Sequence, residues 1–152
     1  MSYTASVWMF VFAAMSFYWA LGGTTGLNTV SLGQEVTGES WFIAALWLTG
    51  ILKVGGGLLA LALVQTWGQQ IPRRLLLIAA WGVGAVLVIH GGDFVIQGAL
   101  TEAGLISLSS PTAWTPDHWQ TFVWGPWWLL GGLFFCLSAW NYQLKSRNQQ
   151  FR

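Results

Sequence analysis

The stretch LLLIAAWGVGAVLVIHGGDFVI, residues 75–96, decides the fold because it is long, apolar and almost uncharged. At a rise of about 1.5 Å per residue, a helix of this length crosses a hydrocarbon core of about 30 Å. Its titratable side chains are His90 and Asp93, which share one helical face. Ionisable groups in a membrane-length helix are costly, so this face is where we look for a site.

The composition extends the membrane interpretation to the whole chain. The protein has 152 residues, of which 55% are hydrophobic and 7% are charged, whereas soluble domains carry roughly 25% charged residues. The net charge of +1 gives no reason to expect nucleic acid as a partner. Cys136 is the single cysteine, which excludes an internal disulfide and any multi-cysteine zinc or iron–sulfur site. We therefore expect one transmembrane domain over residues 1–152, in contact with the lipid bilayer.

Four apolar runs predict an all-α, integral membrane four-helix bundle. We place its helices at about 4–21, 41–67, 72–97 and 116–143. No Lys or Arg precedes Trp8, so the first run is interpreted as a retained helix rather than a signal peptide. Gly56 with Ala60, and Ala80 with Gly84, are small residues at a spacing that favours close helix contact. Pro126 is expected to kink the last helix.

The distribution of basic residues predicts the orientation. Arg73 and Arg74 lie in the short second connection, and Lys145, Arg147 and Arg152 follow the last helix. The two long connections, residues 24–39 and 98–114, contain no Lys or Arg. By the positive-inside rule both termini are cytoplasmic in a bacterial cytoplasmic (inner) membrane, and the two longer loops are extracytoplasmic. We expect these loops to pack on the bundle as a cap.

Several tryptophans lie where interfacial aromatic belts are expected. Trp8, Trp67 and Trp140 fall at the inner ends of the predicted helices. Trp19, Trp41, Trp114 and Trp119 fall at the outer ends.

The first helix ends in Tyr18-Trp19-Ala20-Leu21-Gly22-Gly23. With this YWALGG-type motif in a four-span chain of this length, the sequence resembles the domain of unknown function 3995 family, a group of small bacterial four-helix membrane proteins. The resemblance covers nearly the whole chain and implies a multi-pass membrane protein, but it brings no activity and no catalytic residues. Tyr18, Trp19, Gly22 and Gly23 carry the resemblance. An aromatic anchor followed by a helix stop also accounts for them.

The candidate site combines intramembrane charges with nearby polar groups. Lys53 is the other charge deep in an apolar run, and its long side chain is predicted to reach Asp93 or His90. In an outward-facing polar cavity, Lys53 would hold an anionic group and His90 would exchange a proton. Tyr18 would donate a hydrogen bond. The loop residues Glu35 and His118 would close the cavity. This predicts a protein that binds or conducts a small ligand or a proton.

Other functions are open at this point. The same charges would also suit a purely structural ion pair in a non-catalytic accessory subunit of a larger membrane complex. Four spans are few for a transporter, so a homo-oligomer or a partner membrane subunit is expected. A metal site could draw on His90, Asp93, His118 and Glu35. The sequence has no compact metal-ligand motif, however, and the charge of Lys53 would oppose a metal cation. Haem ligation by the two histidines would need them at facing positions on either side of the ring. No feature of the sequence requires a cofactor or an enzymatic reaction.

Overall fold

The computed structural model describes residues 1–30, 38–105 and 116–150, and every element in these ranges is helical. The all-α class is therefore confirmed, with four long helices in the described chain. The long helices are α1 (Ser2–Ala20), α2 (Ser40–Ala62), α3 (Arg73–Glu102) and α5 (Gly125–Gln150). The short elements are the 3-10 turns η1 (Leu27–Thr29) and η2 (Thr66–Gln70), the helical turn α4 (Pro116–Trp119) and the π-helical turn η3 (Gln120–Trp124).

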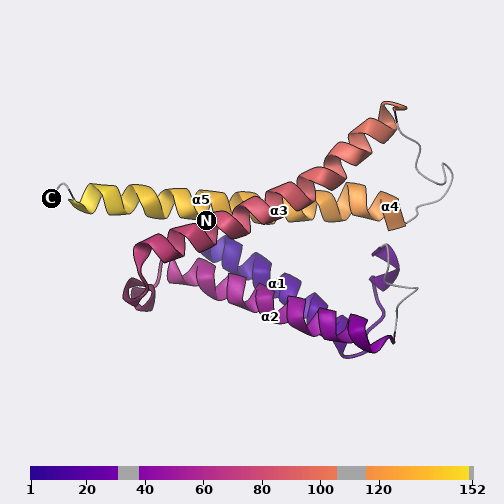
Figure 1. The fold of residues 1–152 in the computed structure, drawn as a ribbon, viewed down its shortest axis with the longest axis horizontal. Helices are drawn as coiled ribbons and strands as arrows, with labels where there is room; N and C mark the ends of the chain where they lie inside the picture. Colours follow the sequence, from indigo (N-terminus) through magenta and orange to yellow (C-terminus); the bar gives the residue numbers. More distant parts are fainter. Residues whose placement is uncertain (31–37, 106–115, 151–152) are drawn as a thin grey trace.

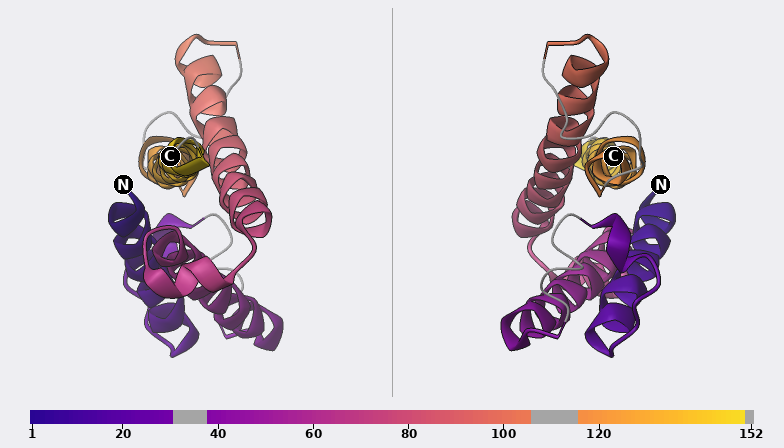
Figure 2. Two further views of the ribbon diagram at one scale, coloured as in Figure 1. Left: turned by 90° about the vertical axis from the view of Figure 1, so that its left-hand side faces the viewer. Right: turned by 90° about the vertical axis from the view of Figure 1, so that its right-hand side faces the viewer.

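The helices form two hairpins that diverge from one end of the molecule to the other. In Figure 1, α1 runs beside α2, and α3 runs beside α5. The hairpins are close at the end that holds η2 and separate toward the end from which the two long connections leave. The end-on views in Figure 2 also show α1 with α2 on one side and α3 with α5 on the other.

The core between the hairpins is aromatic and lies closest to α1 and α5. Trp8 and Phe12 of α1 are buried against each other, with ring centroids 5.3 Å apart. Trp127 of α5 packs on both, at 5.4 Å from Trp8 and 6.2 Å from Phe12. Phe135 is fully buried in the same cluster. Trp8 and Trp19, which were assigned to interfacial belts, are both buried against other helices.

The second and third helices end at other residues than predicted. The second helix ends at Ala62 rather than near residue 67, and a separate 3-10 turn follows it. Gly68 in this turn lies so close to the Ala62 carbonyl that no side chain fits there. The third helix continues to Glu102 instead of ending near residue 97.

The last helix is correctly predicted to start at Pro116, but it is not one uniform α-helix. The turn Gln120–Trp124 is π-helical and directly precedes α5, which continues to Gln150 rather than ending near residue 143. The distortion lies one turn before Pro126, whose ring removes a backbone donor and crowds the preceding turn.

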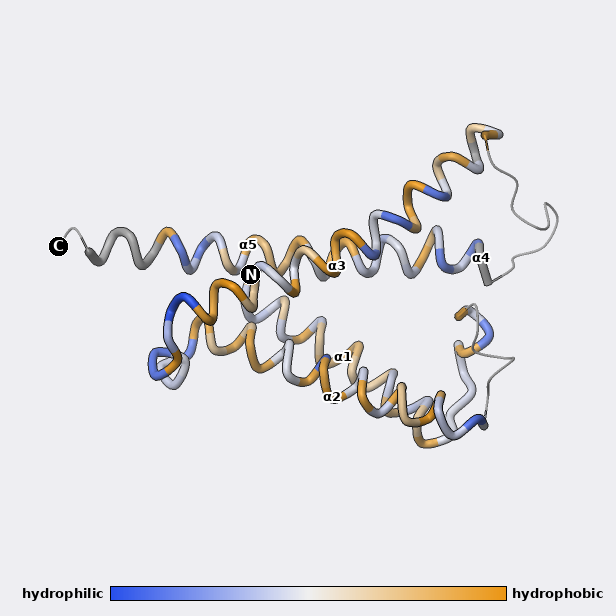
Figure 3. The backbone as a smooth tube through the Cα atoms, viewed as in Figure 1, coloured by the Kyte–Doolittle hydropathy of each residue, from blue (hydrophilic) through white to orange (hydrophobic). Residues whose placement is uncertain are grey.

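Three helices are long and apolar enough to cross a membrane, by their length and composition. They are Ser40–Ala62, Arg73–Thr101 and Gln120–Leu144 among the described residues. Figure 3 shows apolar residues along these helices and a hydrophilic segment at the η2 end of the molecule. The helix α1 is shorter, at 19 residues, and is not among the three.

Candidate functional site

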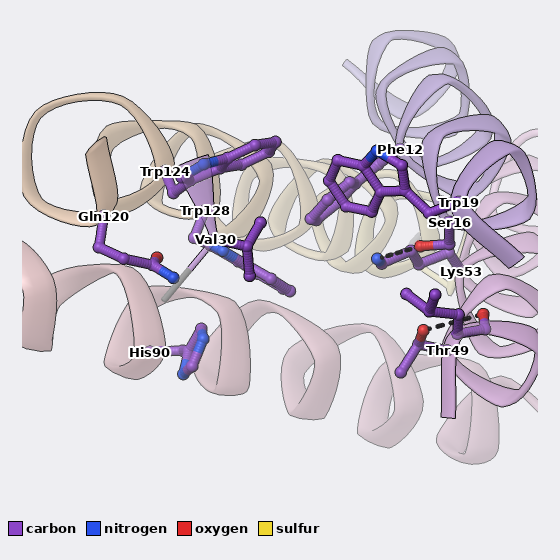
Figure 4. A pocket seen from close by; sticks show the side chains of 11 residues that line it. Phe12, Ser16, Trp19, Val30, Thr49, Lys53, His90, Gln120, Trp124 and Trp128 are labelled. Carbon is purple, nitrogen blue, oxygen red and sulfur yellow. Dashed lines mark hydrogen bonds between the residues drawn. The ribbon is translucent and has the colours of Figure 1, made fainter. Parts of the chain in front are cut away.

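A cavity of about 200 Å³ lies where the two hairpins begin to separate, and we call it the polar cavity. Residues of α1, α2, α3, the π-helical turn and α5 line it. Val30, which follows η1 in the first long connection, also lines it. Its lining mixes aromatic rings with a few polar groups, as in many small-molecule sites. The residues are Phe12, Ser16, Trp19, Val30, Leu46, Thr49, Lys53, His90, Gln120, Trp124 and Trp128 (Figure 4).

Lys53 is the cation of this cavity. Its ammonium Nζ donates a hydrogen bond of 2.7 Å to the Oγ of Ser16, a fully buried side chain on α1. Nζ also lies 3.6 Å from the centroid of the Phe12 ring and 5.8 Å from that of the Trp128 ring. These distances are within the range of cation–π attraction, which stabilises a desolvated ammonium without neutralising it.

The ammonium of Lys53 has more donors than its surroundings use. An ammonium has three N–H donors, and within the described part of the chain Ser16 is the one acceptor bonded to Lys53. The predicted contact with Asp93 is not formed, because Lys53 turns toward α1. The site therefore presents a cation with spare hydrogen-bonding capacity.

Aromatic side chains from α1, η3 and α5 form the walls around Lys53. Phe12 packs edge-on against Trp128, with centroids 4.8 Å apart, and stacks on Trp124 at 6.2 Å. Trp19 meets Trp124 at 6.1 Å. The indole N–H of Trp124 is bonded to the Thr29 hydroxyl at 3.1 Å. Because this last contact ties η1 to the bundle, part of the predicted cap does pack on the helices.

His90 and Gln120 add polar groups on the side of the cavity away from Lys53. The imidazole of His90 packs edge-on against Trp128 at 4.8 Å and against Phe94 at 5.0 Å. Figure 4 shows the Gln120 side chain extending from the π-helical turn toward the cavity. Lys53 and His90 therefore line one cavity, although the His90 side chain is exposed.

Asp93 and Tyr18 lie outside the polar cavity. The carboxylate of Asp93 is exposed and accepts a hydrogen bond of 2.9 Å from the Gln97 amide one turn along α3. Tyr18 is also exposed, and its hydroxyl donates to the Thr25 hydroxyl at 3.0 Å. Neither side chain is available to Lys53 in this arrangement.

Of the two predicted loop residues, only His118 is among the described residues, and it does not line the polar cavity. Glu35 lies outside the described residues. His118 is half-buried on α4 and stacks on Phe122, with ring centroids 6.4 Å apart. Within the described residues, no group of three His, Cys, Asp or Glu side chains is placed to hold a metal ion.

The YWALGG-type motif builds the turn that ends α1. Gly22 has a φ of +93°, a conformation that side chains disfavour. Gly23 lies directly against the Tyr18 ring, which leaves no room for a Cβ. The indole of Trp19 donates to the Thr25 carbonyl at 2.9 Å. The motif therefore fixes a tight turn and, through Trp19, one wall of the polar cavity.

Sequence reasoning missed Ser16, Phe12 and Trp128, the three groups around the Lys53 ammonium. A signal was present in the first helix, where Phe12, Ser16 and Trp19 recur at the helical spacing of four and three residues. That spacing predicts one face bearing an aromatic, a hydroxyl and another aromatic. It does not reveal that this face meets Lys53, 37 residues away.

Comparison with known proteins gives one family. The family model described as "Protein of unknown function (DUF3995)" matches residues 9–135. No curated protein and no solved structure matched the chain.

Proposed function

The chain belongs to the DUF3995 family, and we propose that it is a multi-pass protein of the bacterial cytoplasmic membrane that binds a small anionic group at Lys53. The single observation that carries the proposal is the Lys53 ammonium. It lies in an aromatic cavity with Ser16 as its one hydrogen-bond acceptor among the described residues. The binding group would be a carboxylate or a phosphate, because these accept charge-assisted hydrogen bonds from an ammonium.

We infer that α1 is the fourth span. Its length of 19 residues corresponds to about 28 Å of helix. Its mean hydropathy is lowered by Ser6 and Ser16, which are buried against other helices. The face turned outward carries Val7 and Val11. A helix whose outer face is apolar and whose polar groups point inward fits a lipid environment.

With four spans, both termini lie on the same side of the membrane. The basic residues at the η2 turn and after Leu144 support a cytoplasmic location for the termini by the positive-inside rule. The polar cavity then faces the extracytoplasmic side, since Val30 and the π-helical turn bound it at that end. A ligand from outside would meet the mouth of the cavity before it meets Lys53.

His90 is the proton-exchanging group in this proposal. An imidazole changes charge near neutral pH more readily than any other side chain, and His90 lines the same cavity as Lys53. Protonated His90 would add a second cation for the bound group. Asp93 stays outside the proposed site because Gln97 already holds its exposed carboxylate.

The test is a stability measurement on the purified full chain in mild detergent. Acetate and inorganic phosphate are added at matched ionic strength between pH 5 and 8. We expect either anion to raise the melting temperature of the wild type; a ligand at 100 times its Kd adds about 2.7 kcal/mol. Lys53→Met should remove this effect, and His90→Gln should weaken its pH dependence. Asp93→Asn is the matched control and should respond like the wild type.

One outcome would overturn the proposal. If Lys53→Met responds to acetate and phosphate as the wild type does, then the ammonium is a structural group. The accessory-subunit hypothesis would then take precedence, and co-purifying membrane partners should be sought by native mass spectrometry.

A further inference from the structure

A second cavity opens sideways between α2 and α3, and we call it the lateral groove. Its volume is about 430 Å³. It is lined almost entirely by apolar side chains, from Leu52 on α2, from Val83 and Val86 on α3 and from Met9 on α1. Gly82 also lines it, and a Cβ built there meets nothing within 4 Å. The groove therefore has open space along α3.

The lateral groove and the polar cavity meet at Lys53. Thr49, Lys53 and Trp128 line both cavities. A molecule occupying both would thus pass directly beside the ammonium. One end would lie among Ser16, His90 and Gln120, and the other among aliphatic side chains.

The sizes of the two cavities favour one ligand with two chemically different parts. The polar cavity of about 200 Å³ is smaller than a usual ligand site of about 300–1,000 Å³. The lateral groove, at about 430 Å³, falls within that range, but among the described residues Lys53 is the one charged residue that lines it. A head group suits the first cavity and a hydrocarbon chain suits the second.

We propose that the site takes an anionic amphiphile, whose carboxylate or phosphate group pairs with Lys53 while its hydrocarbon chain lies in the lateral groove. This inference rests on the proposed function and names its ligand class. The groove opens between the membrane-spanning helices, and its rim residues Leu52 and Val86 are 64% and 66% exposed. In a bilayer these rims face lipid hydrocarbon, so an acyl chain can enter from the side.

The depth of Lys53 favours a single-chain ligand with a terminal charge. Lys53 lies 13 residues after Ser40 in α2, which is about 20 Å along the helix. An anion that pairs with Lys53 lies in the polar cavity, and a hydrocarbon chain attached to it can continue into the lateral groove of about 430 Å³. A two-chain phospholipid would have to bring a second chain to the same depth beside this one groove.

The experiment uses a diazirine-tagged dodecanoate as a photoaffinity probe. The full chain is reconstituted in nanodiscs of zwitterionic lipid, illuminated, and the labelled peptides are identified by mass spectrometry. We expect labelling on the α2 and α3 residues of the groove. Unlabelled dodecanoate and dodecyl phosphate should compete about tenfold better than dodecanol. Moving a hydrocarbon chain from lipid into an apolar groove gains little free energy, so the difference in affinity comes from the charged group.

Two substitutions test separately the binding of the ligand's charged head group and the binding of its hydrocarbon chain. Lys53→Met should lower saturable labelling about tenfold. Gly82→Leu should fill the groove and reduce labelling several-fold, while leaving the acetate-induced stabilisation intact. The matched control is Gly55→Leu, because Gly55 also has nothing within 4 Å of a built Cβ and lines neither cavity. Val86→Trp blocks the groove independently if Gly82→Leu does not fold.

The outcomes distinguish this inference from the proposed function. If acetate binds in a Lys53-dependent way but dodecanol competes as well as dodecanoate, or both groove variants label like the wild type, the amphiphile is wrong and the anion site stands. If neither acetate nor dodecanoate depends on Lys53, both proposals fail. Whichever of dodecanoate and dodecyl phosphate competes better identifies the head group.

Discussion

The two hairpins use glycine in different ways. Between α1 and α2, glycines of α2 receive side chains of α1: a Cβ built at Gly57 would lie 2.7 Å from Phe10 Cε1, and one at Gly50 would lie 2.6 Å from Phe17 Cε1. Phe10 and Phe17 are seven residues apart, as are Gly50 and Gly57. Rings thus fill glycine notches every two turns.

Between α3 and α5 the glycines bring two backbones together. A Cβ at Gly91 would lie 2.6 Å from the Leu129 amide nitrogen and 2.7 Å from the Gly125 carbonyl oxygen. A Cβ at Gly132 would lie 2.9 Å from the Val88 nitrogen and 3.0 Å from the Gly84 oxygen. A side chain can rotate away from an added methyl group, whereas a helix backbone must move as a whole. The α3–α5 hairpin should therefore tolerate less change.

The largest effect is expected from Gly91→Ala. Its methyl group would overlap backbone atoms of α5, and such overpacking costs about 1–3 kcal/mol or more. We expect a loss of about 3 kcal/mol in the free energy of unfolding, measured by SDS titration in mixed micelles. Gly92→Ala is the control, because its nearest atom would be 4.0 Å away. Equal stabilities of the two variants would show that α3 and α5 are not in backbone contact.

A smaller effect is expected from Gly57→Ala. The added methyl group would meet the far edge of the Phe10 ring, and Phe10 is partly exposed and can turn toward lipid. We expect a loss of about 1 kcal/mol in the same titration. A second variant, Gly57→Ala with Phe10→Leu, should recover part of this loss because the shorter side chain vacates the notch. A loss as large as that of Gly91→Ala would contradict the proposed difference between the hairpins.

The sequence predicts the helices and some of their contacts, because apolar runs and small-residue spacing are local properties. Gly56, Ala60, Ala80 and Gly84 are all buried, as their spacing predicted. The spacing does not say whether a glycine will meet a ring or a backbone, since that depends on the partner helix. Distinguishing Gly91 from Gly57 therefore required the structure.

The candidate site was predicted in part for a similar reason. Lys53 and His90 both line the polar cavity. The cost of an intramembrane charge favours an inward-facing side chain, but the His90 side chain is exposed. The pairing of Lys53 with Asp93 was predicted from depth and side-chain direction within a closed bundle. The hairpins diverge instead (Figure 1), so Lys53 bonds to Ser16 on its own hairpin. The aromatic contacts across the core join residues far apart in the sequence, so no local pattern predicts how the two hairpins meet.

The smallest effect is expected from Gly55→Ala. This variant tests whether the α2 glycines matter because they contact α1 or because they let α2 bend. Gly55, Gly56 and Gly57 are consecutive, so the triplet could serve α2 either by allowing it to bend or by accepting α1. In water, replacing Gly by Ala in a helix stabilises the helix by about 0.5–1 kcal/mol. The gain is smaller in lipid, because a membrane helix stays helical even when the tertiary structure is lost.

A Cβ at Gly55 meets nothing within 4 Å, so we expect the SDS titration to change by less than about 0.5 kcal/mol, in either direction. A clear loss would mean that α2 needs the flexibility of Gly55 itself. No loss, together with a loss at Gly57, would mean that the triplet acts through the notch that Gly57 offers to Phe10 of α1.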